Sequence, residues 1–179
     1  METVMDIGLL IDGDERAASG AASFERIDPF TGRLATRAAA ASIAAAHAAR
    51  EAAQAAFPAW SKTGPGERRG LLSKAADVMA SKVGEFTKLM MEETGATGPW
   101  AGFNVMLAAN MLREAAAMTT QISGEIIPSD KPGTLAMAIR QPAGVCLGIA
   151  PWNAPVILVT RPIAMPLACG NTVGLKASE

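Results

Sequence analysis

Apolar positions recur along the chain with two spacings, and these predict two kinds of element. A short apolar run at 7–12 is followed by Gly13 and predicts a strand, and residues 23–28, which precede a Pro-containing turn, predict a second strand of an N-terminal β meander. Over 72–90 and 100–118, apolar residues instead step by three and four positions, which predicts two amphipathic helices. The stripe of the second helix includes polar residues, so we expect this helix to line a pocket as well as a core.

An alanine-dominated segment, 38–57, contains no Gly or Pro and predicts a further helix, because Ala has the highest intrinsic helix propensity. Later in the chain, an apolar run at 145–150 and a Pro-containing turn precede an apolar segment at 156–168 and a short run at 172–176. The order strand, turn, helix, strand predicts one βαβ unit with parallel strands. The expected fold class is therefore α/β, with a β meander, three helices and one βαβ unit.

Composition narrows the range of functions. Half of the 179 residues are hydrophobic and the formal net charge is −1, so the chain has material for a core and no basic block for nucleic acid. No apolar stretch reaches about 18 residues, so no membrane span is expected. With His47 as the single histidine, a metal site is not expected. Cys146 and Cys169 do not form a disulfide framework, which indicates the cytoplasm.

Polar side chains follow both strands of the predicted βαβ unit. Asn153 comes after the first strand, and Lys176 and Glu179 come at the end of the second. Ligands of open α/β sheets bind beyond these strand ends, where an amide can stabilise an oxyanion and a Lys–Glu pair can hold ribose hydroxyls. The structural alternative is that Trp152 belongs to the core, Asn153 caps the following helix and both charged groups are solvated.

Several short motifs, in order and spacing, resemble the aldehyde dehydrogenase superfamily over nearly the whole chain. They are Ile-Asp-Gly at 11–13, Phe-Pro-Ala-Trp at 57–60, Glu-Glu-Thr-Gly at 92–95, Gly-Ile-Ala-Pro-Trp-Asn-Ala-Pro at 148–155 and Pro-Leu-Ala-Cys-Gly-Asn-Thr-Val-Gly-Leu-Lys-Ala-Ser-Glu at 166–179. Residues 93–104 are most similar to the aromatic-aldehyde branch, which includes salicylaldehyde and vanillin dehydrogenases. The resemblance implies a partial, Rossmann-like NAD(P)-binding domain over 1–179, with the catalytic domain absent.

The resemblance also implies roles for individual residues. Asn153 corresponds to the oxyanion asparagine, which steadies a tetrahedral thiohemiacetal. Lys176 and Glu179 correspond to the pair that contacts the adenosine ribose. A Glu at this position favours NAD over NADP, because it accepts from a 2′-hydroxyl and repels a 2′-phosphate. Four further residues correspond to the strand end that runs along the dinucleotide: Ile149, Ala150, Pro151 and Trp152.

The expected substrate tunnel involves Trp100 and Phe103 on the third helix, for which plain core packing is the alternative. The chain departs from the family pattern at three positions. Ala154 stands where a bulky aromatic is usual, which leaves room for the ring of an aromatic aldehyde. Pro162 stands where Lys is usual, and Gly174 stands where Val is usual, which weakens the second strand.

In this family the nucleophilic Cys and the general-base Glu lie well downstream of these motifs. We expect neither Cys146 nor Cys169 to replace the nucleophile, because burial in apolar surroundings disfavours the thiolate. The whole enzyme would oxidise a small-molecule aldehyde to a carboxylate and form a homo-oligomer, with 130–143 resembling part of the oligomerisation strand region. The fragment alone is expected to be inactive. The alternative is a non-catalytic remnant or an interaction module.

Overall fold

The structure is a computed structural model that describes residues 4–178 as a mixed α/β fold, which confirms the predicted fold class. Two short 3₁₀ turns at Ser19–Ala21 and Thr119–Gln121 complete the described elements. In chain order the strands and α-helices are β1 (Met5–Ile7), β2 (Leu9–Ile11), β3 (Asp14–Arg16), β4 (Ser23–Ile27), β5 (Leu34–Ala39), α1 (Ile43–Trp60), α2 (Pro65–Ser81), α3 (Val83–Thr94), α4 (Gly98–Met118), β6 (Glu125–Ile127), β7 (Ala136–Ala138), β8 (Val145–Ile149), α5 (Pro155–Ala168) and β9 (Thr172–Lys176).

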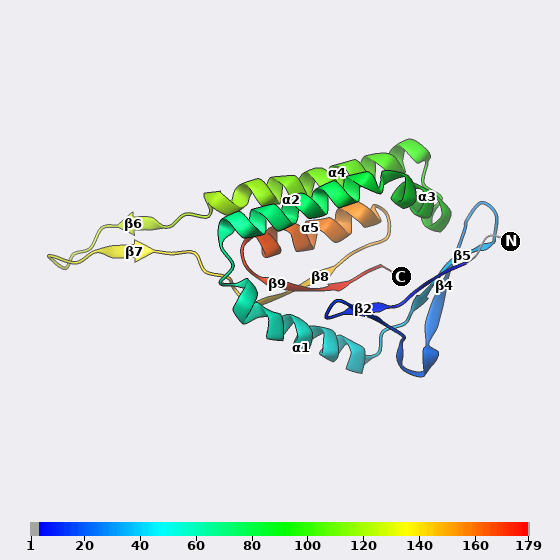
Figure 1. The fold of residues 1–179 in the computed structure, drawn as a ribbon, viewed down its shortest axis with the longest axis horizontal. Coiled ribbons are helices and arrows are strands. Elements are labelled where there is room, and N and C mark those ends of the chain that lie inside the picture. The colour runs from blue at the N-terminus through cyan, green and yellow to red at the C-terminus, as the bar shows by residue number, and fades with distance from the viewer. Residues whose placement is uncertain (1–3, 179) are drawn as a thin grey trace.

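The predicted βαβ unit lies at the centre of the layers. β8 and β9 pair in parallel, and their register runs from Val145 opposite Thr172 to Ile149 opposite Lys176. Figure 1 shows α1 on one side of this two-stranded sheet and α5 on the other, with α2 and α4 beyond α5. The core between α2, α4 and α5 consists of Leu72, Ala76, Leu112, Ala115, Ala116, Ala164 and Ala168.

Helix α5 continues through Pro162 and Pro166, although each proline removes a backbone donor from the helix. The ring of Pro162 packs closely against β8. A Cβ atom added to Gly148 would lie 3.0 Å from both Cβ and Cγ of Pro162, so the glycine gives room for the ring. The departure at Pro162 is therefore matched by a small residue on the neighbouring strand.

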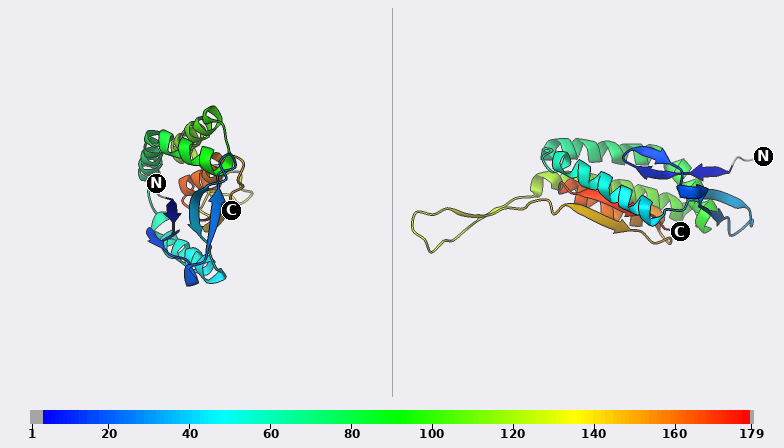
Figure 2. Two further views of the ribbon diagram at one scale, coloured as in Figure 1. Left: turned by 90° about the vertical axis from the view of Figure 1, so that its right-hand side faces the viewer. Right: turned by 90° about the horizontal axis from the view of Figure 1, so that it is seen from below.

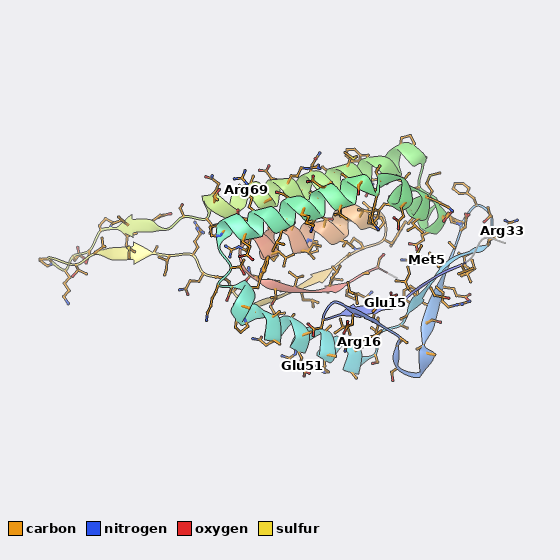
Figure 3. The ribbon with its side chains drawn as sticks, viewed as in Figure 1. Met5, Glu15, Arg16, Arg33, Glu51 and Arg69 are labelled. Atoms are coloured by element: carbon orange, nitrogen blue, oxygen red, sulfur yellow. The ribbon has the colours of Figure 1, made fainter. Side chains whose placement is uncertain are left out.

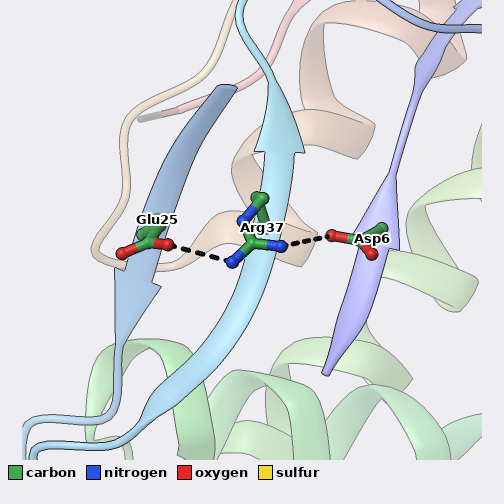
Figure 4. A network of polar contacts seen from close by, with 3 residues as sticks. All are labelled: Asp6, Glu25 and Arg37. Carbon is green, nitrogen blue, oxygen red and sulfur yellow. Dashed lines mark hydrogen bonds and ion pairs between the residues drawn. The ribbon is translucent and has the colours of Figure 1, made fainter. Parts of the chain in front are cut away.

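The N-terminal strands differ from a simple meander. β5 pairs antiparallel with β4 and parallel with β1, while β2 and β3 form a separate hairpin. Arg37 on β5 donates to Glu25 at 3.1 Å and to Asp6 at 3.3 Å, so one guanidinium bridges all three strands of this sheet (Figure 4). The hydrogen bond from Arg37 to Glu25, followed by the charge of Asp6, raises the pKa of Arg37.

Two helix boundaries differ from the sequence prediction. The alanine-rich helix begins at Ile43, because Leu34–Ala39 forms β5, where pairing with two strands overrides the helix propensity of alanine. Ser42 caps the helix by accepting from the Ala45 N–H at 3.2 Å. The helix predicted over 72–90 is divided into α2 and α3 at Lys82, which has φ −98° and ψ 16°.

A β6–β7 hairpin extends away from the helices in Figure 1 and in the right-hand view of Figure 2. Its strands pair antiparallel from Glu125 opposite Ala138 to Ile127 opposite Ala136. The predicted strand at 133–140 is therefore present but shorter, as β7. The hairpin and the loop after it carry exposed apolar side chains at Ile126, Ile127, Leu135, Met137 and Ile139.

Candidate active-site face

The two sequence segments singled out for chemistry meet at one edge of the β8–β9 sheet. Ile149 is the register partner of Lys176, and the Ala150 N–H donates to the carbonyl oxygen of Lys176 at 3.0 Å. The chain then turns through 151–153 into α5. Parallel pairing thus brings the loop that carries Asn153 next to the end of β9, as the βαβ prediction requires. Glu179 lies outside the described residues.

Side chains of this loop are exposed. Trp152 is 63% exposed and Ile149 is 66% exposed, so the alternative that Trp152 belongs to the core is wrong. Asn153 is also exposed, and α5 begins after Ala154 without a side-chain cap, so the capping alternative for Asn153 is wrong as well. Ala150 and Ala154 are buried and anchor the two ends of the loop.

Trp100 and Phe103 lie in the first turns of α4. Their rings are stacked with centroids 5.6 Å apart and an interplanar angle of 24°. They are 44% and 51% exposed, so core packing does not account for either ring. Helix α4 packs against α5, and Figure 1 shows the first turns of both helices at the same end of the molecule as the carboxyl ends of β8 and β9.

Contacts with the N-terminal strands hold the end of α3, which leads into α4. The Thr36 hydroxyl on β5 donates to Glu93 near the end of α3. Gly95 ends α3 at φ +68° and lies close to the connection between β4 and β5. A Cβ atom added to Gly95 would be 2.7 Å from Pro29 Cγ in this connection. In that connection the N–H groups of Phe30 and Thr31 donate to Asp28, and these hydrogen bonds, led by that of Phe30, lower the pKa of Asp28.

The sequence interpretation did not single out Asn104, which is fully buried in α4 one turn after Trp100. Its Nδ2 donates to the carbonyl oxygen of Trp100 at 3.0 Å. Within residues 4–178, Oδ1 of Asn104 is a buried side-chain oxygen without a hydrogen-bond partner. The sequence signal for this residue is an amide at helical spacing from Ala101 and Ala108, with which it shares the buried face of α4.

The opposite end of the βαβ unit holds buried polar groups. Oδ1 of Asn171 accepts from the N–H groups of Ala143 and Gly144 at 2.6 and 3.0 Å, and its Nδ2 donates to Pro166 O at 3.2 Å. Arg68 on α2 is 9% exposed and donates Nε to Ala168 O at 3.0 Å. A second guanidinium nitrogen of Arg68 donates to Thr63 O.

The two cysteines and the histidine are less suited to catalysis. Cys146 in β8 and Cys169 at the end of α5 are free thiols that are both partly exposed, so their expected burial is wrong. His47 is exposed on α1.

Across the described part of the chain, no three His, Cys, Asp or Glu side chains gather as a metal site, and no helix is long and apolar enough to cross a membrane. Other charged side chains, such as Glu51 and Arg69, are exposed on the helices (Figure 3).

Residues 16–179 match the aldehyde dehydrogenase family, so the chain belongs to this family. Vanillin dehydrogenase from Pseudomonas fluorescens is 61% identical over 176 residues, which cover 98% of this chain and 36% of that protein. The crystal structure of a salicylaldehyde dehydrogenase from Pseudomonas putida G7 complexed with salicylaldehyde has a TM-score of 0.95 and 48% identity, covering 98% of this chain and 36% of that one.

These relatives confirm the predicted similarity to vanillin and salicylaldehyde dehydrogenases. They also show that the chain spans about a third of their length and corresponds to their N-terminal portion. A NAD-dependent benzaldehyde dehydrogenase from Corynebacterium glutamicum has a TM-score of 0.89 and 32% identity, covering 95% of this chain and 37% of that one. An NADP dependent enzyme from E. coli has a TM-score of 0.94 and 28% identity, covering 97% of this chain and 36% of that one, so both cofactors occur among the solved relatives.

Proposed function

We propose that this chain is the N-terminal portion of an NAD(P)-dependent enzyme that oxidises an aromatic aldehyde to a carboxylate. The observation that carries the proposal is the pairing of Ile149 with Lys176, which sets the exposed 151–153 loop beside the end of β9. The family and the names of the relatives supply the reaction. The proposed site is therefore one edge of a parallel sheet, where open α/β folds bind their ligands.

The residues present at this edge fit a dinucleotide. Ile149 offers an exposed apolar side chain on which a flat ring can rest, and Lys176 offers an ammonium donor for ribose hydroxyls. Pro151 and Trp152 extend this surface toward α5, and Glu179 is the proposed acceptor that favours NAD. When bound, NAD supplies the hydride acceptor, while these residues hold and orient it.

Asn153 is the proposed oxyanion donor. Its side chain is exposed and makes no hydrogen bond with the described residues, so its amide N–H groups stay available for the oxygen of an aldehyde carbon under attack. Ala154 beside it leaves space for a ring, and the stacked Trp100 and Phe103 offer an aromatic surface at the same end of the molecule. We propose that Ala154, Trp100 and Phe103 line the aldehyde site.

Calorimetric titration of the 179-residue chain with NAD tests the cofactor half of this proposal. We expect binding that weakens about tenfold or more in Lys176→Met, as for the loss of one hydrogen bond to a charged donor. Lys74→Met, on the exposed side of α2, is the matched control and should change nothing. Equal binding by both variants, or no binding by the parent chain, would contradict the role of this edge.

We also propose that the 179-residue chain alone does not catalyse aldehyde oxidation, because the nucleophile and general base of the family are expected downstream of its motifs. Incubation with benzaldehyde and NAD should produce no NADH above a blank without aldehyde. Aldehyde-dependent NADH formation that disappears in Cys146→Ser or Cys169→Ser would show instead that one of these thiols is the nucleophile.

One observation favours a second candidate, an interaction module without catalysis. The β6–β7 hairpin exposes Ile126 and Met137 as a cross-strand pair, 75% and 60% exposed, and we propose that 130–143 and the hairpin pair with another chain. Sedimentation of the purified chain tests this, with an oligomer expected that dissociates in Ile126→Lys. Val78→Lys replaces a 48% exposed apolar residue on α2 and should leave the oligomer intact.

A further inference from the structure

Buried polar side chains in this fold are generally satisfied, and Asn104 departs from that rule. Thr160 on α5 is equally buried, and its hydroxyl donates to Val156 O at 2.8 Å. Asn104 makes the same type of bond to a carbonyl four residues earlier, that of Trp100. In contrast to Thr160, Asn104 also buries an oxygen that has no partner among residues 4–178.

An unpartnered buried oxygen lowers stability, and an apolar side chain of similar size would avoid that cost. Packing therefore does not explain an amide at position 104. What the amide adds is its donor, which reaches a carbonyl that already belongs to the hydrogen-bond ladder of α4. A second donor on one helical carbonyl shifts the local backbone, and the affected residue is Trp100.

We infer that Asn104 is a positioning residue that fixes the Trp100–Phe103 aromatic pair through its hydrogen bond to the carbonyl oxygen of Trp100. The backbone of Trp100 sets the direction in which its ring leaves the helix. That ring is stacked on Phe103 while both remain about half exposed, so neighbouring side chains alone do not confine it. The inference rests on the proposed function in one respect, that the pair contacts an aromatic aldehyde.

Variants can separate the donor from the orphaned oxygen. Asn104→Leu removes both groups at similar volume. Asn104→Ser restores a donor, because a serine hydroxyl reaches the carbonyl four residues earlier in a helix. Asn110→Leu, on the exposed side of the same helix, is the matched control. All are made in a Trp60→Phe, Trp152→Phe background, which leaves Trp100 as the sole tryptophan.

Three measurements are made on each variant: the near-ultraviolet circular dichroism of Trp100, benzaldehyde affinity from quenching of its fluorescence, and the melting temperature. In Asn104→Leu we expect the Trp100 dichroism to fall by about half or more and benzaldehyde affinity to fall about fivefold, as for one lost hydrogen bond, while the melting temperature stays equal or rises. Asn104→Ser should restore both signals, and Asn110→Leu should change neither.

Unchanged dichroism in Asn104→Leu, or a loss that serine does not restore, would overturn the inference and leave Asn104 with a packing role. A different result would contradict the proposed function alone. If the parent chain binds no benzaldehyde while Asn104→Leu still loses the Trp100 dichroism and serine restores it, the aromatic pair is positioned by Asn104 but is not an aldehyde site. Loss of affinity with intact dichroism would also overturn positioning.

Discussion

The two ends of the β8–β9 sheet differ in how they are held. At the amino end, Asn171 joins both strands to the last turn of α5, and Arg68 caps the same helix from α2. At the carboxyl end, the Ala150 N–H bond to Lys176 O is followed by an exposed loop in which Asn153 has no side-chain hydrogen bond to the described residues. One βαβ unit therefore has a fixed end and an open end.

This difference separates stability from binding within a single motif. Side chains at the carboxyl edge are exposed, so their donors and acceptors can be offered to a ligand. The hydrogen bonds of the fixed end set the register that brings 149–153 beside Lys176. Rigid elements thus position the binding edge.

Replacement of Arg68 should break the fixed end most severely. Arg68→Met removes the donors to Ala168 O and Thr63 O, and it removes a cation from the C-terminal end of α5. We expect the free energy of unfolding to fall by about 3 kcal/mol, measured by urea titration. Arg69→Met changes the exposed neighbour labelled in Figure 3 and should stay within about 0.5 kcal/mol.

Asn171→Ala should have the next largest effect. It leaves the N–H groups of Ala143 and Gly144 without their acceptor and removes the donor to Pro166 O, so a loss of about 2 kcal/mol is expected in the same titration. The partner test is Asn153→Ala at the open end, which should cost less than about 0.5 kcal/mol. Equal losses in the two variants would remove the distinction between the ends.

Gly148→Ala probes the packing between β8 and α5. The added Cβ meets Pro162 at 3.0 Å and Leu175 at 3.1 Å, so overpacking should lower the unfolding free energy by about 1 kcal/mol. Gly174 on β9 has no atom within 4 Å of an added Cβ, so Gly174→Ala should be neutral or stabilising. A larger loss in Gly174→Ala than in Gly148→Ala would show that strand propensity, and not the proline contact, governs this sheet.

The smallest effect on stability is expected at the open end itself. Trp152→Ala removes a side chain that is 63% exposed, and the unfolding free energy should change by no more than about 0.5 kcal/mol. NAD affinity should fall in the same variant, because Trp152 belongs to the proposed cofactor surface. A large loss of stability would assign the ring to packing after all.

The βαβ unit was predictable because its signals are local. Apolar runs at 145–150 and 172–176 enclose a helical segment, and Gly and Pro mark the boundaries. The boundary near Ile43 was not predictable in this way, because alanine at 38–39 favours a helix until β1 and β4 pair with β5. Such pairing depends on residues far away in the sequence, which local periodicity does not register.

The candidate site shows the same limit. Spacing predicted that Asn153 and Lys176 follow neighbouring strand ends, and the register agrees. The exposure of Trp152 and Trp100 could not be predicted, since large aromatic residues occur both in cores and at binding sites. The unpartnered oxygen of Asn104 was also beyond sequence reasoning, because it is visible only once the surrounding atoms are placed.

The bonds of the fixed end also have a consequence for the order of folding. Three side chains donate hydrogen bonds to distant carbonyl oxygens: Arg68 to Ala168, Trp60 to Leu167 and Thr172 to Ala53. The sequence separations are 100, 107 and 119 residues. Closing loops of this length costs entropy before the contacts can stabilise the chain, so we expect these hydrogen bonds to form late in folding. Their loss should mainly accelerate unfolding and leave the refolding rate nearly unchanged, which makes the guanidinium of Arg68 a determinant of the lifetime of the folded state.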